Sequence, residues 1–183
     1  MRLAAALALL AVLVALAAGC GGSGSSDSSS SSTPSAQTWA GNLCSSISDW
    51  GNSIKTATSS LKGNVSKSSL QSALGDVSDA TDTFVTDLKG LGKPDTDAGM
   101  QAQSALQNLA TELDADSQAI KNAKSSSNGT VATVSAVTAS LAKMGDQISS
   151  TFATLQGLDA KGELSDAFKN ASSCKNLTKS SSG

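Results

Sequence analysis

Histidine and tyrosine are absent from this chain of 183 residues, and its single arginine is Arg2. Without histidine, the chain offers no Ser-His-Asp or Cys-His catalytic arrangement, no imidazole metal site and no ordinary haem ligand. Without arginine after the second residue, it lacks the planar donor fork with which proteins hold phosphate and carboxylate groups at two points. These absences remove much of known enzyme chemistry, and we therefore expect a protein that is not an enzyme and has no cofactor.

Other chemical motifs are missing as well. Glu112 and Glu163 are the only glutamates, whereas di-iron bundles combine several glutamates with Glu-x-x-His pairs. The chain has no Cys-x-x-Cys-His for haem attachment, no Gly-x-Gly-x-x-Gly and no phosphate-binding loop. Its formal charge is -2, with no basic patch interleaved with aromatics. Nucleic acid is therefore not an expected partner.

The first twenty residues are the most informative part of what is present. Met1-Arg2 precedes an apolar run from Leu3 to Ala18, and small residues lead to Cys20. A short positive start, an apolar stretch and a small-residue break are typical of a secretory signal peptide. Residues 16–20 (Leu-Ala-Ala-Gly-Cys) resemble the lipobox of bacterial lipoproteins, with Ala17 where that family most often has leucine. The resemblance implies that Cys20 receives a diacylglyceryl group and becomes the first residue of the mature protein.

Two alternatives remain for the same segment. A retained transmembrane anchor needs about 20 apolar residues, and this alanine-rich run is shorter. Cleavage by the ordinary signal peptidase would instead release a soluble secreted protein. We favour the lipoprotein interpretation, in which several acyl chains on Cys20 hold the protein stably on the extracytoplasmic face of a bacterial membrane.

Composition divides the remaining chain into three parts. Residues 20–36 comprise the lipidated cysteine and a Gly/Ser-rich stretch with nothing apolar to bury, which is typical of a tether. A random coil of about 16 residues has a root-mean-square span of roughly 20 to 25 Å. Residues 37–178 carry the apolar positions and are long enough for one domain with a core. Residues 179–183 form a serine-rich tail that we expect to be disordered.

Apolar residues in the middle part recur at spacings of three and four, which indicates amphipathic helices. The second stripe, from Leu70 to Leu91, alternates four and three without a slip. No stretch alternates with period two for long enough to predict a sheet. The five stripes consist of Trp39, Leu43, Ile47, Trp50 and Ile54; Leu70, Leu74, Val77, Thr81, Phe84, Leu88 and Leu91; Ala102, Leu106, Leu109, Leu113 and Ile120; Val134, Val137, Leu141, Met144, Ile148, Phe152 and Leu155; and Leu164, Phe168, Ala171 and Cys174.

Turn residues separate the stripes and support a fold class. Thr130 is a plausible N-cap for the fourth helix, and Asp159 for the fifth. Short connections favour antiparallel neighbours. The sequence therefore predicts an all-α protein: an up-down four-helix bundle with an additional C-terminal helix. The breaks are at Gly63-Asn64, at residues 90–94, at residues 127–130 and at residues 157–159.

The two cysteines other than Cys20 lie near the limits of the helical region. In an exported protein an even pair of cysteines is most simply a disulfide, so we expect Cys44 to pair with Cys174. The bridge would close a loop of about 130 residues, for which the chain-entropy model gives an upper value of about 5 kcal/mol. Two buried free thiols are the structural alternative. A redox pair is the functional one, although the chain has no Cys-x-x-Cys.

Acidic and aromatic side chains suggest two further sites. Asp76, Asp79 and Asp82 recur every three residues and could collect a calcium ion, but they lie off the apolar stripe and are better interpreted as a solvated helix face. No EF-hand spacing accompanies them, and we expect no metal site. Trp39 and Trp50 are three helical turns apart and share a face. They could line an apolar ligand pocket, but core packing is the commoner role.

Both ends of the helical region resemble small helical lipoproteins and secreted proteins of actinobacteria. The resemblance rests on Trp39-x-x-x-Leu43-Cys44 near the start and Phe168-x-x-Ala171-x-x-Cys174 near the end. It implies a cysteine pairing and no particular activity. We therefore expect a membrane-anchored, non-catalytic binding or interaction module, with membrane lipid as one partner and an envelope protein as a possible second. The alternative is a carrier that holds a small apolar ligand between its helices.

Overall fold

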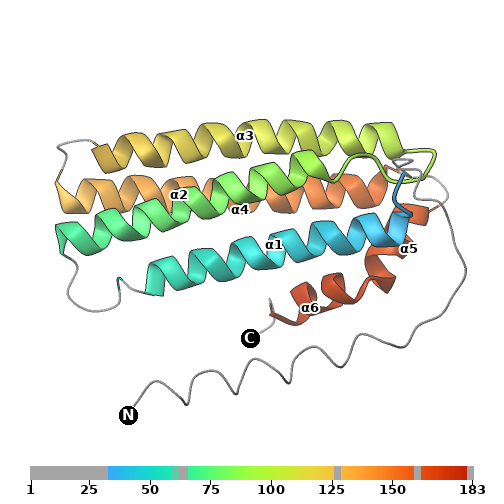
Figure 1. Ribbon diagram of the computed structural model, residues 1–183, viewed down its shortest axis with the longest axis horizontal. Helices are drawn as coiled ribbons and strands as arrows, with labels where there is room; N and C mark the ends of the chain where they lie inside the picture. The colour runs from blue at the N-terminus through green and yellow to red at the C-terminus, as the bar shows by residue number, and fades with distance from the viewer. Residues whose placement is uncertain (1–32, 60, 62–65, 126–128, 159–161, 181–183) are drawn as a thin grey trace, which may run out of the picture. The chain divides into compact units, whose positions relative to one another are not determined.

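The computed structural model describes residues 33–59, 61, 66–125, 129–158 and 162–180. Within these ranges the chain forms six α-helices and no strand, so the all-α prediction is confirmed (Figure 1). None of the described helices is long and apolar enough to cross a membrane. The predicted signal peptide, Cys20, most of the tether and the last three residues lie outside the described residues. The helices are α1 (Ala36–Ser59), α2 (Lys67–Gly90), α3 (Gly99–Ser125), α4 (Thr130–Gly157), α5 (Glu163–Asn170) and α6 (Ser172–Ser180).

The four long helices coincide with the first four apolar stripes, whose positions are buried or half-buried except for Val134, which is 38% exposed. On α2 the predicted stripe is buried from Leu70 to Leu88, and Leu91 just after the helix is half-buried. Thr81, the polar member of that stripe, is 0% exposed. The helical period of three and four therefore placed the buried face of α2 correctly.

The start of α2 shows how a polar residue fixes a helix boundary. The Ser66 hydroxyl accepts a hydrogen bond from the backbone N–H of Ser69, and the Ser69 hydroxyl accepts one from the backbone N–H of Ser66. This reciprocal capping box satisfies two donors that a helix start otherwise leaves unpaired.

The predicted caps of the fourth and fifth helices are wrong. Thr130 is the first residue of α4, and Gly129 is its N-cap because the Gly129 carbonyl accepts the hydrogen bond from the backbone N–H of Thr133. Asp159 lies outside the described residues, and α5 begins after Gly162. Gly162 has φ +77°, in the left-handed region that glycine enters without a side-chain clash.

The single C-terminal helix of the prediction is two helices. The chain leaves the helical region at Ala171, whose ψ of 127° is extended, and α6 follows at once. The break allows each piece to face a different part of the core. Phe168 on α5 packs against Trp39, while Ser173 on α6 donates a hydrogen bond of 2.9 Å to the Gly41 carbonyl.

The packing of the long helices is consecutive. α1 packs on α2, α2 on α3 and α3 on α4, whereas α1 and α4 do not approach each other closely along their described residues. α5 contacts both α1 and α4, and α6 rests on α1 and α5 (Figure 1). α5 therefore occupies the seam that α1 and α4 leave between them, and α6 covers α1 beside it.

Aromatic side chains fill one end of that seam. The Phe168 ring lies 4.6 Å from the Phe152 ring of α4 and 6.2 Å from the Trp39 ring of α1, measured between centroids. A small apolar crevice lies at the other end, by the last turn of α1. Its lining includes no residue of α5 or α6.

Candidate functional site

The predicted disulfide is present. Cys44 on α1 and Cys174 on α6 are bonded, with their Cα atoms 5.0 Å apart, across 130 residues of sequence. The two residues are 0% and 4% exposed. The alternative of two free buried thiols is therefore wrong, and the bridge holds the C-terminal helices against α1. Cys20, the predicted lipidation site, lies outside the described residues.

Both tryptophans belong to the core. Trp39 is fully buried, and its indole N–H donates a hydrogen bond of 3.1 Å to the Gly92 carbonyl. Trp50 is half-buried, stacks on the Phe84 ring at 5.7 Å and donates to the Thr81 hydroxyl at 3.2 Å. Each indole thus pairs its polar atom with the α2 side of the molecule, as a buried tryptophan requires.

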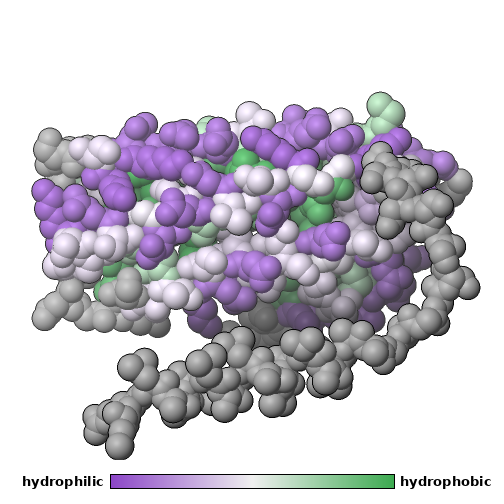
Figure 2. Space-filling view, in the orientation of Figure 1, coloured by the Kyte–Doolittle hydropathy of each residue, from purple (hydrophilic) through white to green (hydrophobic). Residues whose placement is uncertain are grey.

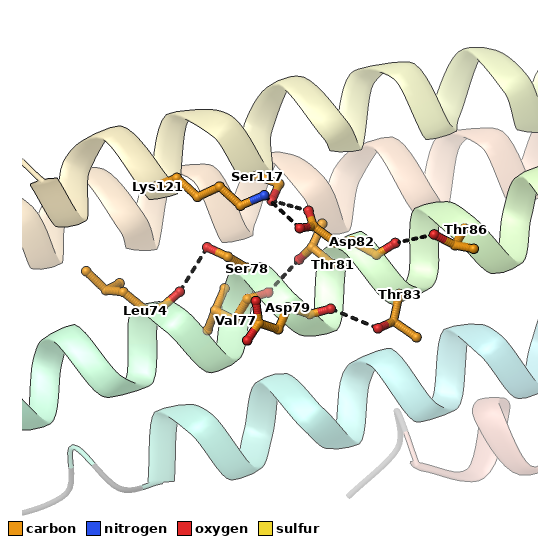
Figure 3. A network of polar contacts seen from close by, with 10 residues as sticks. All are labelled: Leu74, Val77, Ser78, Asp79, Thr81, Asp82, Thr83, Thr86, Ser117 and Lys121. Atoms are coloured by element: carbon orange, nitrogen blue, oxygen red, sulfur yellow. Dashed lines mark hydrogen bonds and ion pairs between the residues drawn. The ribbon is translucent and has the colours of Figure 1, made fainter.

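The three regularly spaced aspartates of α2 have different environments. Asp76 and Asp79 are exposed, as predicted for a solvated face. Asp82 is half-buried and reaches α3, where it accepts hydrogen bonds from the Ser117 hydroxyl at 2.8 Å and from the Lys121 ammonium at 2.6 Å (Figure 3). The solvated-face interpretation holds only in part for Asp82, whose side chain is 42% exposed but pairs with α3. Among the described residues, no three metal-ligating side chains converge.

The contacts of Asp82 set its charge state. Burial by itself would raise the pKa of this carboxyl, but the hydrogen bonds from Lys121 and Ser117 and the lysine charge hold its pKa below the ordinary value. Asp82 is therefore ionised at neutral pH. It joins α2 to α3 rather than exchanging a proton.

Hydroxyl groups along α2 donate hydrogen bonds to backbone carbonyls one turn earlier in the same helix. Ser78 donates to the Leu74 carbonyl and Thr81 to the Val77 carbonyl, both at 2.9 Å and both buried. Thr83 and Thr86 do the same on the exposed side (Figure 3). Small polar residues can therefore face the core without an unpaired donor.

A second ion pair, between α3 and α4, was not anticipated. The Asp116 carboxylate accepts a hydrogen bond of 2.7 Å from Lys143, and its other oxygen, Oδ2, is buried without a partner. The sequence does indicate this ion pair. Asp116 occupies the helical position between Leu113 and Ile120 at which the third stripe has no apolar residue. A charged residue inside an apolar stripe predicts a partner on a neighbouring helix.

The apolar crevice lies where α1 ends. Its lining includes Thr58 and Leu61 at and just after the end of α1, Leu70 and Leu74 of α2, and Val134 and Leu141 of α4. Its volume is about 60 Å³. On the face of the molecule shown in Figure 2, hydrophilic and neutral side chains predominate, and hydrophobic ones are visible mainly in the seams between helices.

Comparison of the chain with protein-family models, with curated proteins and with solved structures gave no match.

Proposed function

We propose that this chain is an extracytoplasmic lipoprotein, held on a bacterial membrane through Cys20, whose helical domain is a non-catalytic binding module. The signal-peptide pattern and the lipobox-like residues within residues 1–20 support the extracytoplasmic, membrane-anchored location. The observation that carries the proposal is the buried Cys44–Cys174 disulfide. Structural disulfides form and persist in oxidising compartments outside the cytoplasm, where a lipobox would send the chain.

We further propose that the four long helices are arranged up-down-up-down. Contacts of α1 with α2 support this order: Trp39 pairs with Gly92, whereas Trp50, eleven residues later, pairs with the earlier Thr81. Contacts of α2 with α3 follow the same rule, since Asp82 meets Lys121 while the earlier Gly75 lies beside the later Lys124. In this arrangement α5 acts as a wedge between the first and fourth helices.

The alternative function, a carrier of a small apolar ligand, would use the crevice beside α1. Sites for drug-sized ligands usually measure about 300 to 1,000 Å³. The crevice volume of about 60 Å³ is far below that range. Two larger hollows, of about 470 and 600 Å³, are open at the surface and lined mostly by polar side chains. The small size of the crevice and the open, polar character of the larger hollows favour a binding surface over an internal ligand site. The hydrogen-bonded indoles of the buried Trp39 and the half-buried Trp50 favour it as well.

Metabolic labelling tests the anchor. Cells that express the full chain and are fed an alkyne analogue of palmitate should label the wild type, whereas Cys20→Ser should remain unlabelled and leave the membrane fraction. The matched control is Cys44→Ser, which removes a cysteine without touching the lipobox and should still label. Equal labelling of wild type and Cys20→Ser would refute the lipoprotein assignment.

Extraction of the purified mature chain tests the binding-module assignment. We expect organic solvent to release no stoichiometric apolar compound from the chain that starts at residue 20, carries Cys20→Ser and is isolated without detergent. A single compound recovered at one equivalent per chain would favour the carrier instead.

A further inference from the structure

The crevice has an apolar rim on α4. We call the crevice together with Val131 and Val134 the crevice face. Val131 is 84% exposed and Val134 38%, and they are two of the three large hydrophobic residues exposed in the described part of the chain. α4 carries no charged residue from Thr130 to Ala142. The face is thus an uncharged helical surface with a protruding valine beside a shallow apolar hollow.

Exposed lysines flank this face. Lys67 precedes the crevice residue Leu70 by three positions on α2, and Lys55 precedes Thr58 by three on α1. Helical residues three apart are surface neighbours. Both lysines are exposed.

Lysines outnumber acidic residues in the sequence segments that contribute the crevice. Residues 50–75 and 117–145 contain half of the lysines and no aspartate or glutamate. Two of these lysines are engaged with Asp82 and Asp116. The nearest other acids of α2 are Asp76 and Asp79, which line a separate groove with Asn52 and Thr56 of α1. The lysines concerned are Lys55, Lys62, Lys67, Lys121, Lys124 and Lys143, of which Lys62 lies outside the described residues.

We propose that the crevice face and its border of Lys55 and Lys67 dock on an anionic lipid surface, as a second membrane contact beside the lipid on Cys20. An anionic headgroup layer attracts lysines, and the layer just below it accepts apolar side chains such as Val131. A purely anionic polymer would use the lysines and gain little from the valines. A second copy of the chain would place lysines opposite lysines.

The distance between Cys20 and the crevice face permits this contact. The docking proposal rests on the lipid anchor of the proposed function. The chain enters α1 at the opposite end from the crevice, where Trp39 bonds to Gly92 and the Pro34 carbonyl accepts from the backbone N–H of Asp95. The 24 residues of α1 span about 36 Å. The sixteen-residue stretch from Cys20 to Ala36 can extend to about 55 Å. It is therefore long enough for the crevice face to reach the membrane that holds Cys20.

A vesicle partition experiment tests the contact without the anchor. The chain from residue 20 onward, carrying Cys20→Ser and its disulfide, is mixed with sucrose-loaded vesicles of phosphatidylcholine alone or mixed with phosphatidylglycerol, and sedimented. We expect binding to the phosphatidylglycerol vesicles only, and a decrease in binding as salt screens the charges. Each lysine near an anionic surface contributes roughly a fivefold factor in partition. Lys55→Glu combined with Lys67→Glu should therefore reduce partition by about twentyfold or more.

Matched variants at the other end of the molecule separate a specific contact from net charge. Lys89→Glu with Lys93→Glu reverses two exposed lysines far from the crevice and should leave partition within about twofold of wild type, apart from screened long-range effects. Val131→Asp should reduce partition, whereas Met100→Asp, at an exposed methionine on the first turn of α3, should not. Circular dichroism of each variant confirms that the helices remain.

Three outcomes would overturn the docking proposal: equal binding to both kinds of vesicle, equal losses in the two lysine pairs, or no binding at all. A dimer detected by sedimentation velocity that Val131→Asp converts to a monomer, without vesicle binding, would assign the face to a second copy instead. None of these results affects the palmitate labelling of Cys20, so failure of the docking and failure of the anchor are distinguishable.

Discussion

Lys143 on α4 donates a 2.7 Å hydrogen bond to Asp116 on α3, and the two ends of this ion pair differ sharply in exposure. The Asp116 side chain is 9% exposed and the Lys143 side chain 61%. One carboxylate oxygen, Oδ2, is buried without a partner. The buried aspartate therefore depends on a lysine that reaches in from solvent.

Removal of that lysine should be costly. Lys143→Met leaves the buried carboxyl of Asp116 without its partner, and we expect the free energy of unfolding in urea to decrease by about 1 to 3 kcal/mol. Lys121→Met is the matched control, because its partner Asp82 has a side chain that is 42% exposed. Its loss should cost no more than about 1 kcal/mol.

The double variant completes the cycle. Asp116→Leu with Lys143→Met replaces the pair by apolar side chains of similar size, and a buried ion pair replaced in this way is often neutral or stabilised. We expect the double variant to lie within about 1 kcal/mol of wild type. Stability of the double variant equal to that of Lys143→Met alone would show that the charge of Asp116 is not the cause.

Thr81 gives a second prediction, because its hydroxyl has two partners. It donates to the Val77 carbonyl and accepts from the indole N–H of Trp50. Thr81→Val keeps the shape and leaves the half-buried indole N–H without an acceptor, which should cost about 1 to 2 kcal/mol. Trp50 fluorescence should also change, since its hydrogen bond is lost.

Thr86→Val is the matched change on the same helix. Thr86 also donates to a backbone carbonyl one turn earlier, but it is exposed. Surface substitutions of this kind usually alter stability by less than about 0.5 kcal/mol. Equal costs at the two positions in urea unfolding would argue against a role for the Trp50 contact.

Local periodicity and non-local pairing explain what the sequence could and could not predict. The stripe from Leu70 to Leu88 identified α2 because burial repeats with the helical turn. The cysteine pair followed from compartment chemistry, and it is present. The pairing of Asp82 with Lys121 was beyond reach, because an aspartate at the edge of an apolar stripe is equally compatible with solvent or with a neighbouring helix.

The end of the chain shows the same limit. Leu164, Phe168, Ala171 and Cys174 are spaced for one continuous helix, yet the chain breaks at Ala171. Tertiary contacts decide the break, since Phe168 packs towards Trp39 while Cys174 bonds to Cys44. Helical propensity is a weak preference that such contacts override.

Asp82 predicts a dependence of stability on pH. Its pKa is lower in the folded chain than the ordinary value of 3.8, so the unfolded chain binds more protons as the pH falls. The stabilisation by the Lys121 contact is thus fully present well above that value and is lost as the pH falls through the lowered pKa. Because both side chains are over one-third exposed, its size should be at most about 1 kcal/mol.

Urea unfolding of wild type and Asp82→Asn at several pH values measures this effect. The wild type should be more stable near neutral pH, and the difference should shrink to nothing at a pH of about 2. Asp79→Asn, at an exposed aspartate one turn earlier, should show no such trend. A stability difference that grows in acid would contradict the assigned direction of the Asp82 pKa.

Reduction of the disulfide tests the closure of the domain. The chain without the Cys44–Cys174 bond gains conformational freedom over the 130 residues between them, and loss of a native disulfide from a small exported domain typically costs about 2 to 5 kcal/mol. Cys44→Ala with Cys174→Ala, in the Cys20→Ser chain, should therefore unfold at lower urea concentration than the oxidised parent. α6 should lose hydrogen-exchange protection first, because the bond ties it to α1 and, among the described helices, it packs only on α1 and α5. Two free thiols in the unreduced parent, or an unchanged urea midpoint in the variant, would contradict a stabilising bridge.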